Sequence, residues 1–331
     1  MGVKRYIAGR ILFVFFAVWV VASFNYIVFY HMIGDPVLLL IRKMPLDEET
    51  IKILRARWGL DKPPIEQYFR YVINMFMGDF GLSFRSFRPV AEEILEKLPN
   101  TLTLMGSGFV ISTVLKLLIG LKIASRRGKM VDMTTLGVSL GLGAVPVFWL
   151  GMIFLLIFSF GLGLFPCYGT ISDPPNNPKD PISFIIDYLW HLTLPLTTLT
   201  IIMTGSGLLG IRNLVLDALS QDYVIAARAK GAPERLILYK HVLKNVAIPV
   251  VTGIAGSIGA ILGGAPTTET VFSWYGLGRY MVESLRELDW PAVQGSFFIM
   301  AIITIFGNLA ADIIYTLIDP RVRVGGKVYG S

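Results

Sequence analysis

The chain has 331 residues, of which 54% are hydrophobic and 16% are charged, and its formal net charge is +7. Soluble domains carry roughly a quarter of charged residues, so this composition indicates a polytopic membrane protein. The single cysteine, Cys167, excludes an internal disulfide and a thiolate metal cluster. The basic residues lie between apolar stretches and do not form one soluble basic face, which argues against a nucleic-acid-binding protein.

Six stretches are apolar over about the twenty residues that a helix needs to cross a bilayer. These predicted spans are residues 11–31, 101–123, 134–160, 189–211, 248–270 and 294–317. The first span follows Lys4, Arg5 and Arg10 and is longer than the apolar core of a cleaved signal peptide. We therefore interpret it as a retained transmembrane helix.

Basic residues predict the orientation of these spans. With the N-terminus inside, the inner segments are 1–10, 124–133, 212–247 and 318–331. They are rich in Lys and Arg, whereas the short outer loop 161–188 contains only Lys179. Short cytoplasmic loops are enriched in basic residues, so both termini are expected in the cytoplasm. The predicted fold is all-α, a multi-pass protein of the cell membrane with six transmembrane helices.

Residues 34–100 form one long segment between the first two spans, and they are predicted to fold into an outer helical subdomain. Asp47, Glu48 and Glu49 suit the first turn of a helix that ends before Gly59. A second helix is expected after Pro63-Pro64. A segment of roughly 65 residues buries too little surface to be robust alone, so this subdomain is expected to pack on the outer membrane face.

A polar and basic stretch, Asp222 to Pro249, separates the fourth and fifth predicted spans. One face of its first helix, at i, i+3, i+4 and i+7 spacing, consists of Tyr223, Ala226, Ala227 and Lys230. Gly231 is placed to end this helix, and Pro233-Glu234 suit the start of another. The small side chains would let the first helix enter a groove on another protein. Composition alone also allows a solvated basic loop.

The order of residues in this stretch resembles a known motif. Ala226-Ala227, Gly231 and Ile248-Pro249 are similar to the EAA loop of binding-protein-dependent ABC importer permeases, although Ile225 stands where Glu or Thr is usual. Strings similar to the dipeptide/oligopeptide branch of these permeases follow in order along nearly the whole chain. They include WGLDKPPIEQY (58–68), GDFGLSF (78–84), LPNTLTL (98–104), LGGAPTTETVFSWYGLGR (262–279) and IDPRVR (318–323).

The resemblance implies the type I ABC importer permease fold. Its parts would be an N-terminus with the first span (1–33), the outer subdomain (34–100), a transmembrane core (101–318) and a cytoplasmic tail (319–331). It implies that residues 217–247 form the coupling loop, which docks on a cytoplasmic ATPase. The contacts implied for that docking are Tyr223, Ala226, Ala227, Arg228, Lys230 and Gly231.

The resemblance also implies partners: a second homologous permease, two cytoplasmic ATPase subunits and an extracytoplasmic substrate-binding protein. The chain contains no G-x-x-x-x-G-K-[ST] phosphate-binding loop. ATP is therefore expected to bind to the partner subunits, and no catalytic residue, cofactor or metal is expected in this chain.

Several residues within the spans are candidates for a pore or gate. Gly263, Gly264 and Pro266 interrupt the fifth span and indicate either a gate or a packing kink. Glu269 ends that span and either faces the translocation route or acts as an interfacial hydrogen-bonding acid. Lys116 lies in the second span, where snorkelling toward the inner interface is the favoured interpretation and a pore or subunit-interface role is the alternative.

Glycine pairs in the spans predict close helix packing. Gly205-x-Gly207-x-x-Gly210 fits a dinucleotide-binding pattern, but it lies inside an apolar span instead of a βαβ unit. Gly137-x-x-x-Gly141 is interpreted in the same way.

The resemblance favours peptide import, and two alternatives stay open. Relatives within the same family import oligosaccharides or nickel. An ion-coupled secondary transporter is the alternative from another class, and it would need intramembrane acids. Asp312 is the only acid well within a predicted span.

Overall fold

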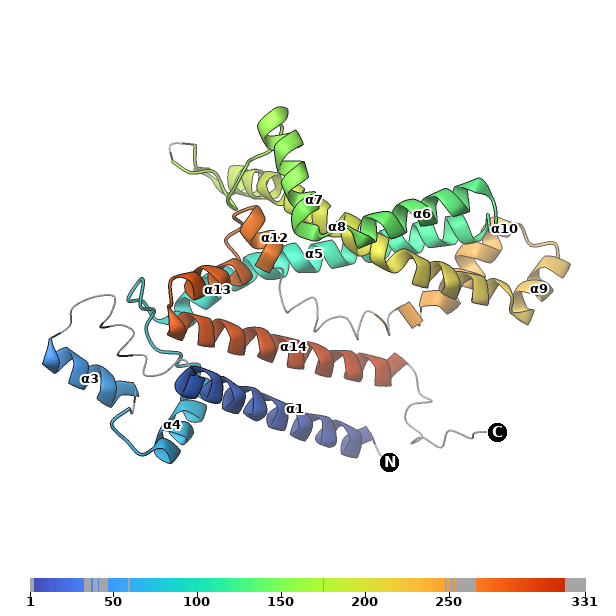
Figure 1. The fold of residues 1–331 in the computed structure, drawn as a ribbon. Coiled ribbons are helices and arrows are strands. Elements are labelled where there is room, and N and C mark those ends of the chain that lie inside the picture. Colours follow the sequence, from blue (N-terminus) through green and yellow to red (C-terminus); the bar gives the residue numbers. More distant parts are fainter. Residues whose placement is uncertain are drawn as a thin grey trace.

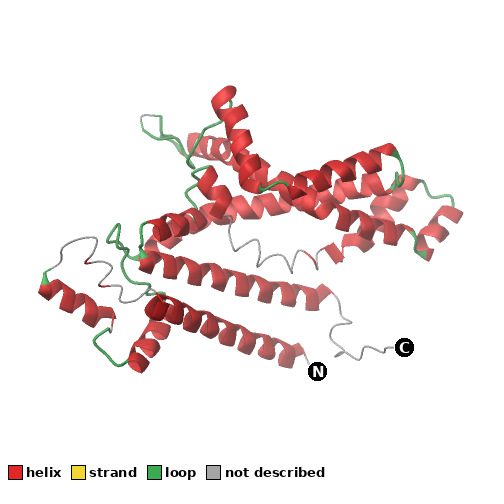
Figure 2. Ribbon diagram, in the orientation of Figure 1, coloured by secondary structure: helices red, strands yellow, loops and turns green. Residues whose placement is uncertain are grey.

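The structure is a computed structural model that describes residues 3–32, 47–58, 60–174, 176–247 and 266–318, together with the isolated positions 37, 41, 249, 250 and 253. Every regular element in these ranges is a helix, and the one isolated β-bridge joins Leu82 to Pro89 (Figure 2). The prediction of an all-α fold is confirmed for this part of the chain.

The first and last helices lie side by side. α1 (Val3–Tyr26) continues into a π-helical turn, η1 (Ile27–Met32), and α14 (Trp290–Ile318) runs along it (Figure 1). On α1, Val14, Val18 and Ala22 recur every four residues and face an apolar cluster that includes Phe298 of α14. Burial of this one stripe joins the two ends of the sequence.

A long parallel pair, α5 (Val90–Ala124) and α8 (Pro181–Leu219), forms the centre of the fold. A Cβ built on Gly108 would lie 3.6 Å from Leu199 Cβ, and one built on Gly120 would lie 2.9 Å from Ile211 Cγ2. In both contacts the partner lies 91 positions further along the chain. A constant positive offset means that the two helices run in the same direction.

α6 (Met130–Ala144) packs closely on α8 through glycine. A Cβ on Gly205 would lie 2.6 Å from the Ser139 carbonyl oxygen, and one on Gly143 would lie 2.8 Å from the Ser206 nitrogen. The packing prediction for Gly205 is confirmed. Gly137 and Gly141 pack on no other described helix of this chain, because a Cβ there meets nothing within 4 Å. These two glycines are offset by two residues from the Ser139–Gly143 ridge, which turns them to the opposite face of the helix.

The third predicted span, 134–160, is not one straight helix. α6 ends at Ala144, and α7 (Val147–Phe154) and the π-helical η2 (Leu155–Gly161) follow at a bend of 97°. Val145 is extended, with ψ 131°. This conformation is expected before Pro146, because the proline ring disfavours helical geometry in the preceding residue.

Four described helices are individually long and apolar enough to cross a membrane, and the bent pair counts as at most a fifth. These four stretches are Gly9–Phe29, Val90–Ala124, Pro181–Leu219 and Trp290–Ala310. The predicted fifth span, 248–270, lies mainly outside the described residues. Its described end is a short helix, α12 (Pro266–Val271), which is followed by α13 (Leu277–Arg286).

Both helices predicted for the subdomain at residues 34–100 are present. In α3 (Glu48–Trp58), the Asp47 carboxylate accepts a hydrogen bond from the Thr50 nitrogen at 3.1 Å and caps the first turn. α4 (Pro64–Met77) begins at the predicted prolines and ends at Gly78, whose φ of +76° suits glycine. The expected end of the first helix at Gly59 lies outside the described residues.

Candidate functional site

A helical hairpin lies where α5 and α8 end (Figure 1). It comprises α9 (Asp222–Ala229), α10 (Glu234–Leu236) and the π-helical η3 (Ile237–Val242), and we call residues 222–242 the coupling hairpin. Gly231 separates α9 from α10 with φ +77°, and Ala232 N donates to Ala227 O at 3.1 Å. This is a glycine-terminated helix end, as the sequence predicts.

The coupling hairpin is anchored in the fold by apolar side chains. Val224, Ile237 and Val242 are fully buried against Leu121 of α5 and Val215 of α8. Burying several aliphatic side chains stabilises a contact by about 1.5–3 kcal/mol each. The hairpin is thus a folded unit attached to two long helices rather than a solvated loop.

The residues predicted to share one face of α9 are divided between two faces. Tyr223 and Ala227 are partly buried against the apolar cluster, whereas Ala226 and Lys230 are exposed. The reason is that Val224 faces the core, and Tyr223 and Ala227 lie on one side of it and pack against the same cluster. The face left free also carries Ile225, which is 57% exposed. Sequence reasoning noticed this isoleucine only as a departure from the EAA motif.

An ion pair holds the two arms of the coupling hairpin together across Gly231. Arg228 Nε lies 2.7 Å from Glu234 Oε1, and Nη2 donates to Oε2 at 3.3 Å. The Arg228 guanidinium keeps the pKa of the Glu234 carboxyl below its usual value. Arg228 therefore has a partner inside the hairpin in addition to its predicted role beside the docking surface.

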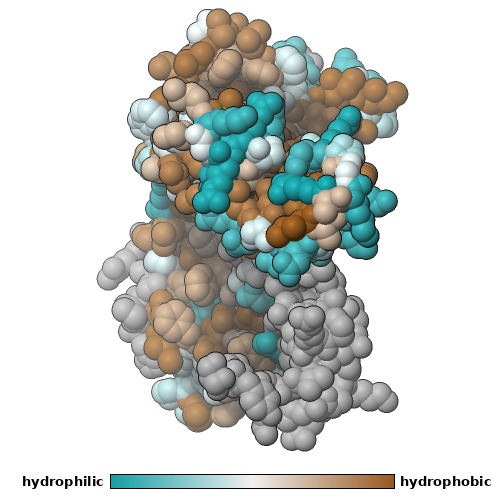
Figure 3. Space-filling view, turned by 90° about the vertical axis from the view of Figure 1, so that its right-hand side faces the viewer, coloured by the Kyte–Doolittle hydropathy of each residue, from teal (hydrophilic) through white to brown (hydrophobic). Residues whose placement is uncertain are grey.

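The surface at this end of the molecule is hydrophilic with hydrophobic atoms between the polar ones (Figure 3). Leu236 and Tyr239 are exposed apolar residues of the second arm. An open pocket of about 550 Å³ lies there, lined by Pro233, Arg235, Leu236, Tyr239 and Lys240. Sequence reasoning did not single out this exposed second arm, although its alternation of apolar and basic residues was a signal.

Glu269 lies toward the other end of α5, and it is fully buried. Its carboxylate accepts hydrogen bonds from Thr101 Oγ1 at 2.7 Å and from Arg279 N at 2.9 Å. Gly276 lies directly against it, since a Cβ there would be 2.5 Å from the carboxyl carbon. The geometry agrees with a hydrogen-bonding acid, which was the alternative to a residue that faces the translocation route.

Two more buried acids, each with its own hydrogen-bond donors, link the same group of helices, and we call the three the carboxylate network. Glu93 accepts a hydrogen bond from the Tyr280 hydroxyl at 2.6 Å, and burial raises the pKa of that tyrosine so that it remains the donor. Asp289 precedes α14 and accepts from Ser83 Oγ at 2.5 Å and from Phe84 N at 3.0 Å. The signal for Asp289 was an acid directly before a helix. The network ties α5, α12, α13 and α14 together.

Two family profiles match the chain. The binding-protein-dependent transport system inner membrane component matches residues 116–324, which is more than half of the chain, and the N-terminal part of the same membrane component matches residues 3–105. The chain belongs to this family. The first match contains the coupling hairpin, and the second contains α1, α3 and α4.

Curated relatives cover most of the permease. It is 34% identical over 311 residues to the dipeptide transport system permease protein DppB of Escherichia coli (strain K12), covering 89% of this chain and 92% of the relative. It is 35% identical over 302 residues to the oligopeptide transport system permease protein AppB of Bacillus subtilis (strain 168), covering 88% and 90%. It is 33% identical over 321 residues to the glutathione transport system permease protein GsiC of Escherichia coli O1:K1, covering 96% and 99%.

The permease is an inner membrane protein, as its family and its long apolar helices show. Among the described residues, no group of three His, Cys, Asp or Glu side chains is arranged to hold a metal ion.

Lys116 of the permease lies across Gly207 of α8. A Cβ on that glycine would be 2.8 Å from Lys116 Cδ, and the Lys116 Nζ is 6.0 Å from the centre of the Phe109 ring. Phe109 is seven residues nearer the N-terminus of α5, so the predicted snorkelling toward the hairpin end is wrong. The cause is that helical side chains lean toward the N-terminus of their own helix.

The remaining gate candidates are only partly described. Pro266 begins α12, where its missing N–H is tolerated. Gly263 and Gly264 lie outside the described residues.

Proposed function

We propose that this permease forms half of the translocation pore of an ATP-driven ABC importer for dipeptides or oligopeptides. The names and the nearly full-length similarity of the relatives support this cargo. In the proposed arrangement the chain has six spans with both termini in the cytoplasm. The coupling hairpin is then on the cytoplasmic side, and the carboxylate network is toward the extracytoplasmic side.

The observation that carries the coupling role is the packing of the hairpin. Its outward face presents Ile225, Ala226 and Ala229, which are exposed and, apart from the isoleucine, small. Its inward face presents Val224 and Ile237, which are buried against α5 and α8. A push on the outward face is therefore delivered to both long helices.

The partners follow from this arrangement. A second homologous permease completes the pore, two cytoplasmic ATPase subunits bind ATP and dock on the hairpins, and an extracytoplasmic binding protein delivers the cargo. ATP shifts the pore between inward-open and outward-open states only if the ATPases bind it with different affinity in the two states. Oligosaccharides or nickel are the alternative cargoes within the family.

Lys116 stands as a pore candidate in this proposal. The described residues place an aromatic ring 6.0 Å from its ammonium group and form no ion pair with it. An ion-coupled carrier is less well supported, because the described buried acids accept hydrogen bonds within the chain.

The test uses the exposed face of α9. Ala226→Glu places a charge where the ATPase would dock, and Ser125→Glu adds the same charge at an exposed position of another inner segment, outside the predicted coupling loop. In complexes purified through a tag on this chain, Ala226→Glu should lose the ATPase subunits and ATP-dependent peptide uptake, whereas Ser125→Glu should keep both. Ala227→Glu is a poorer probe, because Ala227 packs inward. Normal ATPase retention and uptake by Ala226→Glu would overturn the coupling role.

A further inference from the structure

α4 carries three different sectors around its circumference. One sector is buried against the α1 cluster and contains Tyr71, Val72 and Met75. A second sector is polar and contains Glu66, Gln67, Arg70 and Asn74. The third sector is apolar and yet exposed, and we call it the α4 stripe: Ile65, Phe69, Ile73 and Phe76.

The α4 stripe is continuous along the helix. Its members are spaced by four, four and three residues, so they lie one above the other on one side. Each is between 42% and 66% exposed. Single apolar side chains at a surface are ordinary, but a contiguous patch of large ones marks a contact with lipid or with another protein.

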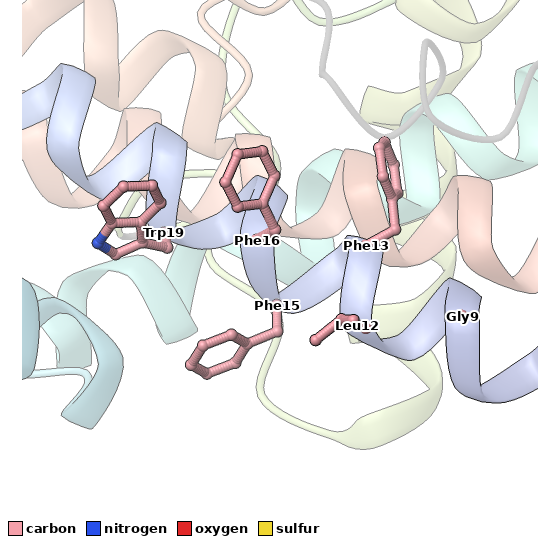
Figure 4. Close-up of a pocket in the computed structure, with 6 residues that line it drawn as sticks. All are labelled: Gly9, Leu12, Phe13, Phe15, Phe16 and Trp19. Atoms are coloured by element: carbon pink, nitrogen blue, oxygen red, sulfur yellow. The ribbon is translucent and has the colours of Figure 1, made fainter.

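The stripe joins a surface that already faces lipid. The Phe76 ring lies 5.6 Å from the Phe15 ring of α1, measured between ring centroids. Phe15 itself is 62% exposed on a helix that is long and apolar enough to span the membrane. Figure 4 shows Leu12, Phe13, Phe15, Phe16 and Trp19 projecting from α1, and these residues line an open apolar pocket.

Contacts at both ends of α4 give its depth in the membrane. At its start, the Pro64 carbonyl accepts a hydrogen bond from the Tyr26 hydroxyl at 3.2 Å. At its end, the Phe76 ring contacts the ring of Phe15, which precedes Tyr26 by eleven residues on α1. Eleven residues of helix correspond to about 16 Å, roughly half of the ~30 Å hydrocarbon core. α4 therefore inclines back along the membrane-spanning part of α1.

We propose that α4 is embedded in one leaflet beside α1, with the α4 stripe in contact with acyl chains and the polar sector facing the headgroups. In the orientation proposed above this is the outer leaflet, but the lipid contact does not depend on the cargo or on the coupling role. The helix can enter lipid because its backbone groups are paired internally and the Gly78 N–H bonds to the Asn74 and Met75 carbonyls.

The charges of α4 fit the same position. Glu66 and Arg70, one turn apart, form an ion pair at 3.0 Å, which reduces the cost of placing them near the hydrocarbon. As in amphipathic membrane helices, the apolar side is then buried in acyl chains and the polar side is turned toward the headgroups. Docking of the binding protein would instead leave a stripe of four large apolar residues facing water whenever the binding protein is absent.

Site-directed spin labelling of the reconstituted full complex tests this proposal. The chain has one cysteine, so Cys167→Ser gives a background free of native thiols in this subunit. Nitroxides are then attached singly at Phe69→Cys and Ile73→Cys in the stripe and at Arg70→Cys in the polar sector. Leu12→Cys on α1 serves as the lipid reference and Asp61→Cys as the water reference, since both positions are exposed.

Labels at 69 and 73 should collide with oxygen, which concentrates in lipid, at least several times more often than with a water-soluble nickel chelate. The label at 70 should show the reverse preference. High nickel accessibility at 69 and 73 would overturn the proposal in favour of a water-exposed stripe. Low accessibility to both reagents would overturn it in favour of coverage by a second protein chain. Loss of peptide transport with unchanged accessibilities would bear on the proposed function alone.

Discussion

The Thr101 hydroxyl donates to the Glu269 carboxylate at 2.7 Å although 168 residues separate the two in the sequence. The same hydroxyl oxygen accepts a hydrogen bond from Leu277 N at 2.8 Å. One small side chain of α5 thereby holds α12 and α13 in place. The contact therefore joins two strings that lie far apart in the sequence, LPNTL, which contains Thr101, and TETV, which contains Glu269.

Thr101→Val should destabilise the permease. Valine keeps the shape of the side chain, but it removes one of the donors to a buried carboxylate and the acceptor of the Leu277 N–H, which costs about 1–3 kcal/mol. We expect a lower unfolding temperature of the purified protein. The control is Thr197→Val, because Thr197 is exposed and bonds to the Thr193 carbonyl in its own helix. Equal unfolding temperatures for the two variants would refute the role of Thr101.

Gly205→Ala should weaken the packing of α6 on α8. The new methyl group would meet backbone atoms of Ser139 and Gly143, which cannot rotate away, and overpacking costs about 1–3 kcal/mol. Gly210→Ala is the matched control in the same helix, because a Cβ there meets nothing within 4 Å. Thermal unfolding in detergent should separate the two variants, and a Gly205→Ala protein as stable as wild type would contradict the packing.

Asp289→Asn should loosen the loop that precedes α5. The carboxylate accepts from Ser83 Oγ and from the Phe84 and Arg85 nitrogens, and an amide offers only one acceptor oxygen. Amide hydrogen exchange at residues 84 and 85 should accelerate by about tenfold or more, as expected from losing roughly 1.4 kcal/mol of local stability. Asp79→Asn serves as control, since Asp79 is exposed and caps only Gly81 N. Unchanged exchange in Asp289→Asn would be inconsistent with this anchor.

The ion pair in the coupling hairpin should be sensitive to acid. Because Arg228 lowers the folded-state pKa of Glu234, the pair stabilises the hairpin above the unfolded value of 4.5, and this contribution is lost as the pH falls through the folded value. Both side chains are largely exposed, so the effect should stay below about 1 kcal/mol. The protection factors of the hairpin amides, which are exchange rates corrected for the intrinsic pH dependence of exchange, should decrease below pH 4.5 in the wild type and change less in Arg228→Gln. The same acid response in both would exclude the pair as its source.

Gly231→Val should impair coupling while the spans remain folded. A φ of +77° costs an L-residue roughly 1–2 kcal/mol, and a β-branched side chain is the least tolerant. Gly231→Asn should retain more uptake, because asparagine adopts this conformation more readily and a Cβ at this position meets no atom within 4 Å. ATP-dependent uptake in proteoliposomes measures the difference, with the unfolding temperature as the check on folding. Equal uptake by the two variants would argue against a conformational role for Gly231.

Local sequence signals predicted much of the fold. Proline and glycine marked the start and end of α4, and glycine marked the turn of the coupling hairpin. Hydropathy found the four long apolar helices but not their lengths, because α5 continues back to Val90 through polar residues that lie beyond the apolar window. Hydropathy did not predict the bend before Pro146, because apolar residues continue across it.

Less of the candidate site could be predicted from the sequence, because its contacts join residues that are far apart along the chain. Helical spacing grouped Tyr223 with Ala226, but the cluster around Val224 decides which of them faces inward. The carboxylate network could not be found locally, since Glu93 and Tyr280 are 187 residues apart. The direction of Lys116 could have been worked out beforehand from the tilt of side chains on a helix, and Asp289 from its position directly before a helix.

α5 contains 35 residues, and at 1.5 Å each it is about 50 Å long. Thr101 lies toward one end, and Leu121 in the coupling-hairpin cluster lies near the other. A rod that pivots on α8 moves its two ends in opposite directions. Opening at one side of the membrane and closing at the other would then be a single tilt, and no relay of side-chain rearrangements through the bilayer would be required.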